Sequence, residues 1–315
     1  MKAVVVHKHG STNALSYENA AKPVVKAGQV LVKNHFIGVN YIDIYQREGT
    51  YPTDLPAILG REGSGEVAEL GPEVTEFNVG DRVAYISPGA YAEYTAVDAR
   101  HILKLPEKIS LENGAAVLLQ GLTAAYLVTD SYKVKPGDFV LVPAAAGGAG
   151  NMICQMAANY GATVIGLVSN ADKAIFAKQH GAKYVINYTE QDFAKEVMKI
   201  TNGKGVQVVY DGVGAAIYGE CIKSLAKYGH YINFGNASGK VDKFDLFDLT
   251  PKCLTAMRPS LFYYVETRKE FLACMIMARY SLVVHLTDVM CSVGEAGNAN
   301  SRGQDQDWHS SYLRN

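Results

Sequence analysis

The chain has 315 residues, 48% of them hydrophobic, and its formal net charge at pH 7 is −1. This length allows two domains with substantial cores, and a charge so close to zero argues against nucleic acid as a partner. No run of residues approaches the ~18 consecutive apolar residues that a membrane span needs, and no apolar segment marks secretion. The five cysteines are scattered without a C-x-x-C pair, so we expect reduced thiols in a cytoplasmic protein.

Residues 1–118 predict a small domain built mostly of β-strands. Short β-type runs alternate there with Gly-Pro, Gly-Asp and Pro-Gly turns, which is typical of a barrel. The runs span 1–7, 29–36, 65–70, 82–86 and 91–97. A short helix is expected at about 41–49. From 110 to about 134 the pattern becomes helical, and we expect the domain boundary in that region.

A glycine cluster at 147–150 follows the apolar run Val140–Val142 and precedes a helical stretch. Ala144, Gly147 and Gly150 are spaced three apart, a variant of the dinucleotide-binding fingerprint. Glycines let the backbone approach a pyrophosphate, and the N–H groups and dipole at a helix N-terminus favour its negative charge. The alternative is a glycine-rich turn that closes any βα unit, and the residues that follow decide between the two.

Strands and helices alternate after the glycine cluster. The expected strands span 163–168, 184–187, 206–211 and 230–234, and the expected helices span 171–180, 191–201 and 217–227. This alternation predicts a doubly wound parallel sheet of the Rossmann type, which binds its cofactor at the carboxyl edge of the strands.

The end of the second strand of this sheet indicates which dinucleotide binds. NAD-preferring sites usually carry Asp or Glu roughly 20 residues past the glycines, to hold the ribose 2′-hydroxyl. Here the strand ends in Ser169 and Asn170, and Lys173 follows one helical turn later. A hydroxyl and an ammonium suit a 2′-phosphate, which a carboxylate would repel, so the sequence favours NADPH. The alternative is that Lys173 is a solvated helix residue beside Asp172.

Four motifs carry a family resemblance. They are Gly38-Val39-Asn40-Tyr41-Ile42-Asp43 with Arg47, Gly49, Tyr51 and Pro52, then Leu59-Gly60-Arg61-Glu62-Gly63-Ser64-Gly65, Gly80-Asp81-Arg82-Val83, and Phe234-Gly235-Asn236-Ala237-Ser238-Gly239. Together they resemble the zeta-crystallin-like quinone oxidoreductases, a zinc-free branch of the medium-chain dehydrogenase/reductase superfamily, from Met1 to about Phe271.

The resemblance implies an α/β protein with two domains. A GroES-like β-barrel catalytic domain would comprise residues 1–118 and 255–297, and a Rossmann NADPH-binding domain would comprise residues 119–254. It also implies a homodimer, formed by joining the sheets of two cofactor domains edge to edge.

Two residues of these motifs bear on metal binding. Asn40 and Arg61 stand where zinc-containing members of the superfamily carry a cysteine and a histidine, and neither an amide nor a guanidinium replaces those ligands. The cysteine-rich lobe that holds a structural zinc is also missing, so we expect no metal. Without a Lewis acid, alcohol dehydrogenation loses its usual mechanism, whereas hydride delivery to a conjugated electrophile such as a quinone or an enone remains feasible.

By resemblance, the residues that surround the acceptor are Asn40, Asp43, Tyr45 and Tyr51. The site must align the acceptor with the nicotinamide and donate hydrogen bonds to the developing oxyanion, and Tyr51 or water would supply the proton. For Asp43 and Tyr45 the alternative is a scaffolding role, in which one side chain caps the local helix. Arg61 is expected to pair with Glu62 or with a neighbouring carboxylate.

The resemblance also assigns the cofactor contacts. They are Gln120 and Thr123 near the nicotinamide; Ala146, Gly147, Gly148 and Ala149 at the pyrophosphate; Ser169, Asn170, Lys173 and Tyr188 at the 2′-phosphoadenosine; and Val213, Gly214, Phe234, Gly235 and Asn236 along the ribose and nicotinamide. Tyr188 has a simpler alternative, because it follows Asn187 and can merely end a strand.

The last residues depart from the family. Val283–Val289 still resembles a family strand and Gly294–Ala296 the start of the next helix, but 298–315 is polar and predicts an irregular tail. Relatives carry an Arg-x-x-Thr-Gly segment and an apolar strand here. If the codons of Gln304–His309 are read in a frame shifted by one base, they can encode such a segment. In that frame the Trp308 codon supplies the first two bases of a glycine codon. We therefore hypothesise a frameshift near 297–302 that removes the last strand, which sequencing of the transcript would test.

Three functions are compatible with these observations. The leading one is reduction of a quinone by NADPH, with one- and two-electron transfer both open. The alternative on the same scaffold is an NADPH-dependent enone or 2-alkenal reductase. A non-catalytic RNA-binding or crystallin-like role occurs among the relatives, but no basic stripe or aromatic RNA-binding motif supports it in this chain.

Overall fold

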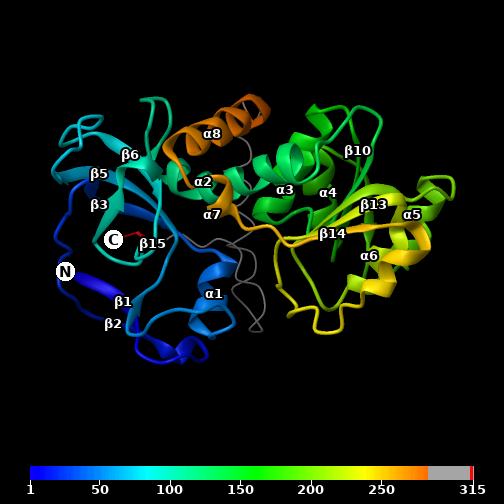
Figure 1. The fold of residues 1–315 in the computed structure, drawn as a ribbon, viewed down its shortest axis with the longest axis horizontal. Helices are drawn as coiled ribbons and strands as arrows, with labels where there is room; N and C mark the ends of the chain where they lie inside the picture. The colour runs from blue at the N-terminus through cyan, green and yellow to red at the C-terminus, as the bar shows by residue number, and fades with distance from the viewer. Residues whose placement is uncertain (283–312, 315) are drawn as a thin grey trace. The chain divides into compact units, whose positions relative to one another are not determined.

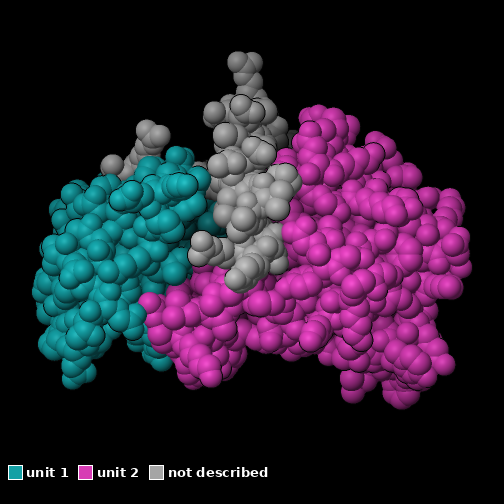
Figure 2. All heavy atoms as spheres, turned by 90° about the horizontal axis from the view of Figure 1, so that it is seen from above, with its two compact units in different colours: residues 1–119, 285–315 teal, residues 120–284 magenta. Residues whose placement is uncertain are grey.

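The computed structural model describes residues 1–282 and 313–314 (Figure 1). The described residues divide into two compact units, one of residues 1–119 with 313–314 and the other of residues 120–282 (Figure 2). Among the described residues, no helix is both long and apolar enough to cross a membrane.

The first unit contains two β-sheets. The smaller sheet has three strands in the order β2-β1-β4, and the larger has six, in the order β15-β3-β5-β6-β8 with β7 also paired to β3. These strands are β1 (Lys2–Val6), β2 (Leu15–Asn19), β3 (Gln29–Gly38), β4 (Ala57–Ile58), β5 (Glu62–Leu70), β6 (Arg82–Ile86), β7 (Tyr94–Asp98), β8 (Ile102–Lys104) and β15 (Leu313–Arg314). All of their pairings are antiparallel, and the predicted β-barrel domain is confirmed.

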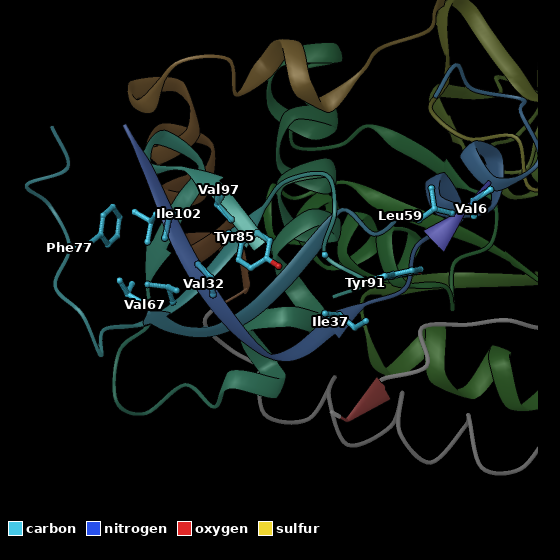
Figure 3. Packing of buried hydrophobic residues seen from close by; sticks show 13 residues of the cluster. Val6, Val32, Ile37, Leu59, Val67, Phe77, Tyr85, Tyr91, Val97 and Ile102 are labelled. Atoms are coloured by element: carbon cyan, nitrogen blue, oxygen red, sulfur yellow. The ribbon is translucent and has the colours of Figure 1, made fainter. Parts of the chain in front are cut away.

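Inward-facing apolar side chains of the first unit form one core cluster (Figure 3). Val32 on β3 and Tyr85 on β6 are fully buried in it, and Phe77 and Ile102 belong to the same cluster. The hydroxyl of Tyr85 donates to Asn34 Oδ1 at 2.8 Å, so this polar atom is satisfied inside the apolar core. The short elements of the unit are the 3₁₀ turns η1 (Thr12–Ala14) and η2 (Ala99–His101) and the helix α1 (Tyr41–Arg47).

The second unit contains a six-stranded parallel sheet in the order β11-β10-β9-β12-β13-β14. Its strands are β9 (Phe139–Val142), β10 (Thr163–Val168), β11 (Ala182–Asn187), β12 (Val206–Asp211), β13 (Leu225–Asn233) and β14 (Thr255–Met257). The strand order reverses between β9 and β12, which is the point where doubly wound sheets bind their ligands. The predicted Rossmann architecture is confirmed.

Helices cover both faces of this sheet (Figure 1). On β10, Ile165 packs in a core cluster with Phe193 and Val197 of α5. The next residue, Gly166, faces the other side of the sheet, where a Cβ built on it would contact Ala177 of α4. Consecutive strand residues are therefore buried on opposite faces, which explains the continuous apolar runs in the sequence. The helices are α2 (Leu111–Tyr126), α3 (Gly148–Asn159), α4 (Ala171–Gln179), α5 (Phe193–Ile200), α6 (Tyr218–Ser224), α7 (Leu261–Tyr264) and α8 (Arg268–Leu282), with the π-helical turn η3 (Leu127–Ser131) and the 3₁₀ helix η4 (Leu246–Lys252).

Two predicted boundaries in this unit were wrong. The helix expected at 217–227 ends at Ser224 because Leu225, its C-cap, adopts an extended conformation (φ −72°, ψ 146°), and β13 begins at that residue. Residues 255–282 were assigned to the catalytic domain, but β14 extends the Rossmann sheet beside β13, and α8 packs against α3. Hydrophobic periodicity cannot tell which sheet a short strand joins.

The tail also differs from its prediction where the structure describes it. Leu313–Arg314 forms β15 antiparallel to β3, with Leu313 opposite Ile37, so the tail is not irregular throughout. The strand predicted at 283–289, the helix start at 294–296, the rest of the tail and the site of the proposed frameshift lie outside the described residues.

Candidate active site

On the acceptor side, the predicted residues gather at the start of α1 in the first unit. Asn40 is the N-cap, and its backbone N–H donates to Asp43 Oδ2 at 2.8 Å, which is half of a capping box. The Tyr91 hydroxyl donates to the same oxygen at 2.8 Å. Asp43 is only 3% exposed. Its carboxylate therefore has the capping role that the sequence offered as an alternative, and it supports Asn40 from inside the unit.

Glu62 holds the side chain of Asn40. Asn40 Nδ2 donates to Glu62 Oε1 at 2.7 Å, and the N–H of Leu119 donates to Glu62 Oε2 at 2.8 Å. Glu62 is 1% exposed, whereas Asn40 is partly exposed. Asn40 thus bridges two buried carboxylates, with its backbone bonded to Asp43 and its amide bonded to Glu62.

Burial changes the acidity of this pair. It raises the pKa of Asp43 to about 6, against the opposing effects of its hydrogen bonds and of the Arg61 charge. It raises the pKa of Glu62 to about 7, and the neighbouring Asp43 contributes in the same direction. Arg61 donates from Nε to Gln46 Oε1 at 3.1 Å, and its charge acts on Asp43, the neighbouring carboxylate that the sequence analysis allowed. The oxygens of Glu62 accept from Asn40 and Leu119.

These raised pKa values predict how stability depends on pH. Between about pH 4 and pH 7 the folded chain holds protons on Asp43 and Glu62 that the unfolded chain has released, so the free energy of unfolding falls as pH rises. Each unit of pKa difference is worth about 1.4 kcal/mol. Urea unfolding at about pH 5.5 and pH 8, at one ionic strength, should give the lower stability at pH 8. A flat or rising profile over this range would contradict the prediction.

Three tyrosines of α1 and the following turn pack together. The rings of Tyr45 and Tyr51 are 5.1 Å apart between centroids, and those of Tyr41 and Tyr45 are 6.1 Å apart. Tyr45 is buried, whereas Tyr51 keeps part of its surface exposed. The backbone N–H of Tyr51 donates to the carbonyl of Tyr45 at 3.1 Å, which holds the turn in place. Tyr45 therefore supports Tyr51 by packing, and Tyr51 is the one of the two that can meet a ligand.

On the cofactor side, the glycine turn follows β9 in the second unit. The N–H of Gly147 donates to the carbonyl of Ala144 at 2.8 Å, and Ala144 itself adopts a positive φ of 53°. A Cβ on Gly150 would overlap the Ala144 carbonyl, and one on Gly148 would overlap the side-chain amide of Gln120. The turn is thus compact because of its glycines, and α3 begins at Gly148 with its N-terminal N–H groups directed out of the helix.

The residues expected at the 2′-phosphate lie together at the carboxyl ends of β10 and β11. Lys173 Nζ donates to Ser169 Oγ at 3.3 Å, and the Lys173 N–H donates to Asn170 Oδ1 at 2.9 Å, which caps α4. The N–H of Tyr188 donates to the carbonyl of Val168 at 3.1 Å, so Tyr188 follows β11 beside this group. A cation paired with a hydroxyl, and no carboxylate at the strand end, fits a phosphate on the ribose.

The two remaining turns that were predicted to line the cofactor share one buried carboxylate, Asp211. Its oxygens accept from the N–H groups of Val213 and Gly214, and from the Tyr231 hydroxyl and the Asn233 amide. Burial raises the pKa of Asp211, and these hydrogen bonds oppose the shift. The turns that carry Val213 with Gly214, and Phe234 with Gly235 and Asn236, also bond one another through Ser238 N–H and Val213 O at 2.8 Å.

Sequence reasoning missed three residues that position the others: Glu62, Tyr91 and Asp211. Glu62 appeared only within the family motif and as a partner for Arg61, and its strand, which also carries Glu66 and Glu69, gave no sign that this carboxylate is the buried one. Asp211 ends the apolar strand 206–211 directly before a glycine, the place where a doubly wound sheet holds its ligand turns. Tyr91 gave no local signal.

The metal positions named by the sequence hold no cluster of the required kind. Within residues 1–282 and 313–314, no group of three His, Cys, Asp or Glu side chains could hold a metal ion. Asn40 is engaged with Glu62 and Arg61 with Gln46, as described above.

Comparisons with known proteins first identify the class. The alcohol dehydrogenase GroES-like domain family matches residues 26–107, and the zinc-binding dehydrogenase family matches residues 148–276. These two matches define a two-domain dehydrogenase or reductase.

Individual relatives narrow this class. A quinone oxidoreductase of Pseudomonas aeruginosa is 40% identical over 276 residues, covering 86% of this chain and 85% of the relative. A 2-haloacrylate reductase of Burkholderia sp. is 40% identical over 278 residues, covering 85% and 84%. The structure of Escherichia coli quinone oxidoreductase complexed with NADPH superposes with a TM-score of 0.88, at 35% identity over 100% of both chains. The chain belongs to the quinone oxidoreductases of the medium-chain dehydrogenase/reductase superfamily.

Proposed function

We propose that the chain is an NADPH-dependent quinone reductase that works without zinc. The observation that carries this is the whole-length similarity to a quinone oxidoreductase complexed with NADPH. The Ser169–Lys173 pair supports the choice of NADPH over NADH, because it offers a cation and a hydroxyl where NAD sites carry a carboxylate. The GroES-like unit holds the acceptor and the Rossmann unit holds the cofactor.

The residues of the Rossmann unit bind and orient the cofactor. The glycine turn and the N-terminus of α3 hold the pyrophosphate, with Ala146 to Ala149 along it, and Ser169, Asn170, Lys173 and Tyr188 hold the 2′-phosphoadenosine. Gln120 and Thr123 lie towards the nicotinamide, and the turns held by Asp211 line the ribose. When bound, NADPH supplies the hydride.

The residues of the GroES-like unit act on the acceptor. The Asn40 amide donates a hydrogen bond to the quinone oxygen on which negative charge develops. Tyr51, or water beside it, gives that oxygen a proton, so one hydride and one proton convert the quinone to the hydroquinone. Asp43 and Tyr45 keep these groups in place by capping and packing.

A second candidate is reduction of a carbon–carbon double bond conjugated to a carbonyl or carboxylate. The 40% identity to a 2-haloacrylate reductase favours it specifically. The same donors would then stabilise an enolate, and the proton would go to carbon.

The deciding experiment follows NADPH consumption optically with a benzoquinone, with 2-chloroacrylate and with a simple enone. Quinone-dependent consumption that exceeds the other two in kcat/KM supports the leading proposal. Turnover restricted to 2-chloroacrylate or the enone transfers the assignment to the second candidate. Tight NADPH binding with no turnover of any acceptor refutes both and leaves a non-catalytic role.

We further propose a cytoplasmic homodimer. Cys154, Cys221, Cys253 and Cys274 are free thiols, as expected in a reducing compartment. Among the described residues, β14 is one of the two edge strands of the parallel sheet, with β11 at the other edge, and an unpaired edge is a template for joining another sheet. The 3₁₀ helix η4, which precedes β14, leaves Leu246 72% exposed and Phe247 80% exposed, and such apolar exposure suits an interface.

Phe247→Glu is expected to convert the dimer to a monomer, because it places a charge in this apolar contact. Light scattering after gel filtration measures the mass directly. Val79→Glu is the matched control, since Val79 is also exposed but lies in the first unit, and it should stay dimeric. A monomeric wild type, or a dimeric Phe247→Glu, refutes this interface.

A further inference from the structure

We infer that Glu62 is a positioning residue that fixes the orientation of the Asn40 amide, so that Asn40 presents an N–H donor to the acceptor. This inference rests on the proposed function, because it concerns how the acceptor oxygen is recognised. It assigns a task to a buried carboxylate that neither touches the cofactor nor reacts.

The chemistry of the Glu62 carboxylate restricts how the Asn40 amide can be oriented. At pH 8, above the raised pKa of Glu62 (about 7), this carboxylate is ionised and only accepts hydrogen bonds, so the end of the Asn40 amide that faces Oε1 must be the nitrogen, here at 2.7 Å. Oε2 is occupied by the N–H of Leu119 at 2.8 Å, a backbone group in α2 that cannot turn away. With Glu62 1% exposed, water does not compete for either oxygen, and the carboxylate is fixed at both ends.

The other end of the amide is directed by the start of α1. In the capping box, the carbonyl oxygen of the Asn40 side chain faces the Asp43 N–H. One N–H of the amide is thereby bonded to Glu62, and the amide oxygen is directed towards the start of α1, where the Asp43 N–H bonds to the backbone carbonyl of Asn40 at 3.0 Å. The second N–H remains, on a residue that is partly exposed. A reversed amide would instead offer oxygen lone pairs to a developing oxyanion and repel it.

A charge-conserving exchange separates orientation from mere hydrogen bonding. In the double variant Asn40→Asp with Glu62→Gln, the introduced glutamine donates from its amide nitrogen to the new carboxylate, and its amide oxygen accepts from Leu119. The network is complete and the cap is kept, since Asp is a good N-cap, but no N–H faces the acceptor. In Glu62→Gln alone, one end of the introduced amide is a nitrogen, which faces a donor, either the Leu119 N–H or the Asn40 amide. The Asn40 amide is then free to rotate by 180°, which exchanges its oxygen and nitrogen.

The measurements, all made at pH 8 where Glu62 is ionised, are kcat and KM for the quinone, KM for NADPH, and thermal unfolding. We expect Glu62→Gln to lower quinone kcat/KM about tenfold and the exchange variant to lower it about a hundredfold, the cost of one lost oxyanion donor. The KM for NADPH should stay within about twofold, and the exchange variant should unfold near the wild-type temperature. In an Asn40→Ala background, Glu62→Gln should cause no further loss. Glu69→Gln, an exposed change on the same strand, is the control and should match wild type.

Wild-type turnover in the exchange variant overturns the inference. Restoring a hydrogen bond between positions 40 and 62 would then be sufficient for activity, without an N–H donor directed at the acceptor. Independent, multiplying effects of Asn40→Ala and Glu62→Gln also overturn it. If the wild type reduces no acceptor, the proposed function fails by itself. In that case, thermal unfolding of the same single and double variants still measures the interaction between Asn40 and Glu62. If the destabilising effects of the two single substitutions add in the double variant, the two side chains do not interact, and the inference is overturned.

Discussion

Replacing Lys173 with glutamate is expected to raise the KM for NADPH about a hundredfold and to change the KM for NADH by no more than about twofold. Lys173 Nζ lies 3.3 Å from Ser169 Oγ, where the 2′-phosphate is expected. A charge-assisted hydrogen bond to phosphate contributes about 1.5–3 kcal/mol, and a carboxylate adds repulsion, so a loss of about 2.8 kcal/mol is reasonable. Initial rates with each cofactor, at fixed quinone, give both values.

The matched control for this change is Lys178→Glu. Lys178 is exposed on the same helix, and the net charge changes equally, but it lies in the last turn of α4, away from Ser169. It should leave both KM values close to those of the wild type. Equal losses with NADPH and NADH in Lys173→Glu would show that the lysine does not read the 2′-phosphate.

Asp211→Ala is expected to lower the free energy of unfolding by about 4 kcal/mol and to raise the KM for NADPH. The variant leaves three donors without the acceptor that they have in the wild type: the N–H of Val213 (2.7 Å), the N–H of Gly214 (3.0 Å) and the Tyr231 hydroxyl (2.6 Å). The Asn233 amide also loses a bond to this carboxylate (3.2 Å), although it keeps the Gly235 carbonyl as an acceptor. Each unsatisfied buried group costs about 1–3 kcal/mol, partly offset by relaxation and water entry. The cofactor is affected because both turns on its ribose side lose their common anchor.

Urea titration of the free energy of unfolding is the test for Asp211. Asp242→Ala, which removes an exposed carboxylate from the same unit, should change it by less than about 0.5 kcal/mol. Asp211→Asn should be intermediate, because it keeps one oxygen but turns an amide nitrogen towards a donor. A loss below about 1 kcal/mol in Asp211→Ala would mean that the donors find other partners.

The cofactor unit was largely predictable from sequence because its signals are local. The strands 163–168 and 206–211 lie at their predicted bounds, since a strand buried on both faces must be a continuous apolar run. The strand β14 was not predicted, because three residues with exposed ends carry no period. This strand belongs to the Rossmann sheet because it pairs with β13. The two strands are separated along the chain, so no local sequence pattern predicts that they pair.

The acceptor site was predictable only in part. Resemblance named Asn40 and Asp43, and the local pattern Asn-x-x-Asp offered the cap that the structure contains. The network behind them depends on Tyr91, 48 residues from Asp43 in the chain, and on Leu119, 57 residues from Glu62. Such contacts form when the sheets fold together, and no hydrophobic periodicity in the sequence indicates them. The substrate roles of Asn40, Asp43, Tyr45 and Tyr51 remain proposals.

The cysteines of this protein have a consequence for an enzyme that handles electrophiles. Quinones and conjugated enones alkylate thiolates, and the thiolate is the reactive form of cysteine. Burial raises the pKa of Cys154 and Cys274 to about 12 and also raises the pKa of Cys221 well above its usual range, so all three stay protonated at neutral pH. Of the cysteines in residues 1–282, Cys253 alone is exposed. The three buried cysteines therefore resist alkylation, and among the cysteines that the structure describes, damage by excess quinone should begin at Cys253, two residues before the edge strand β14.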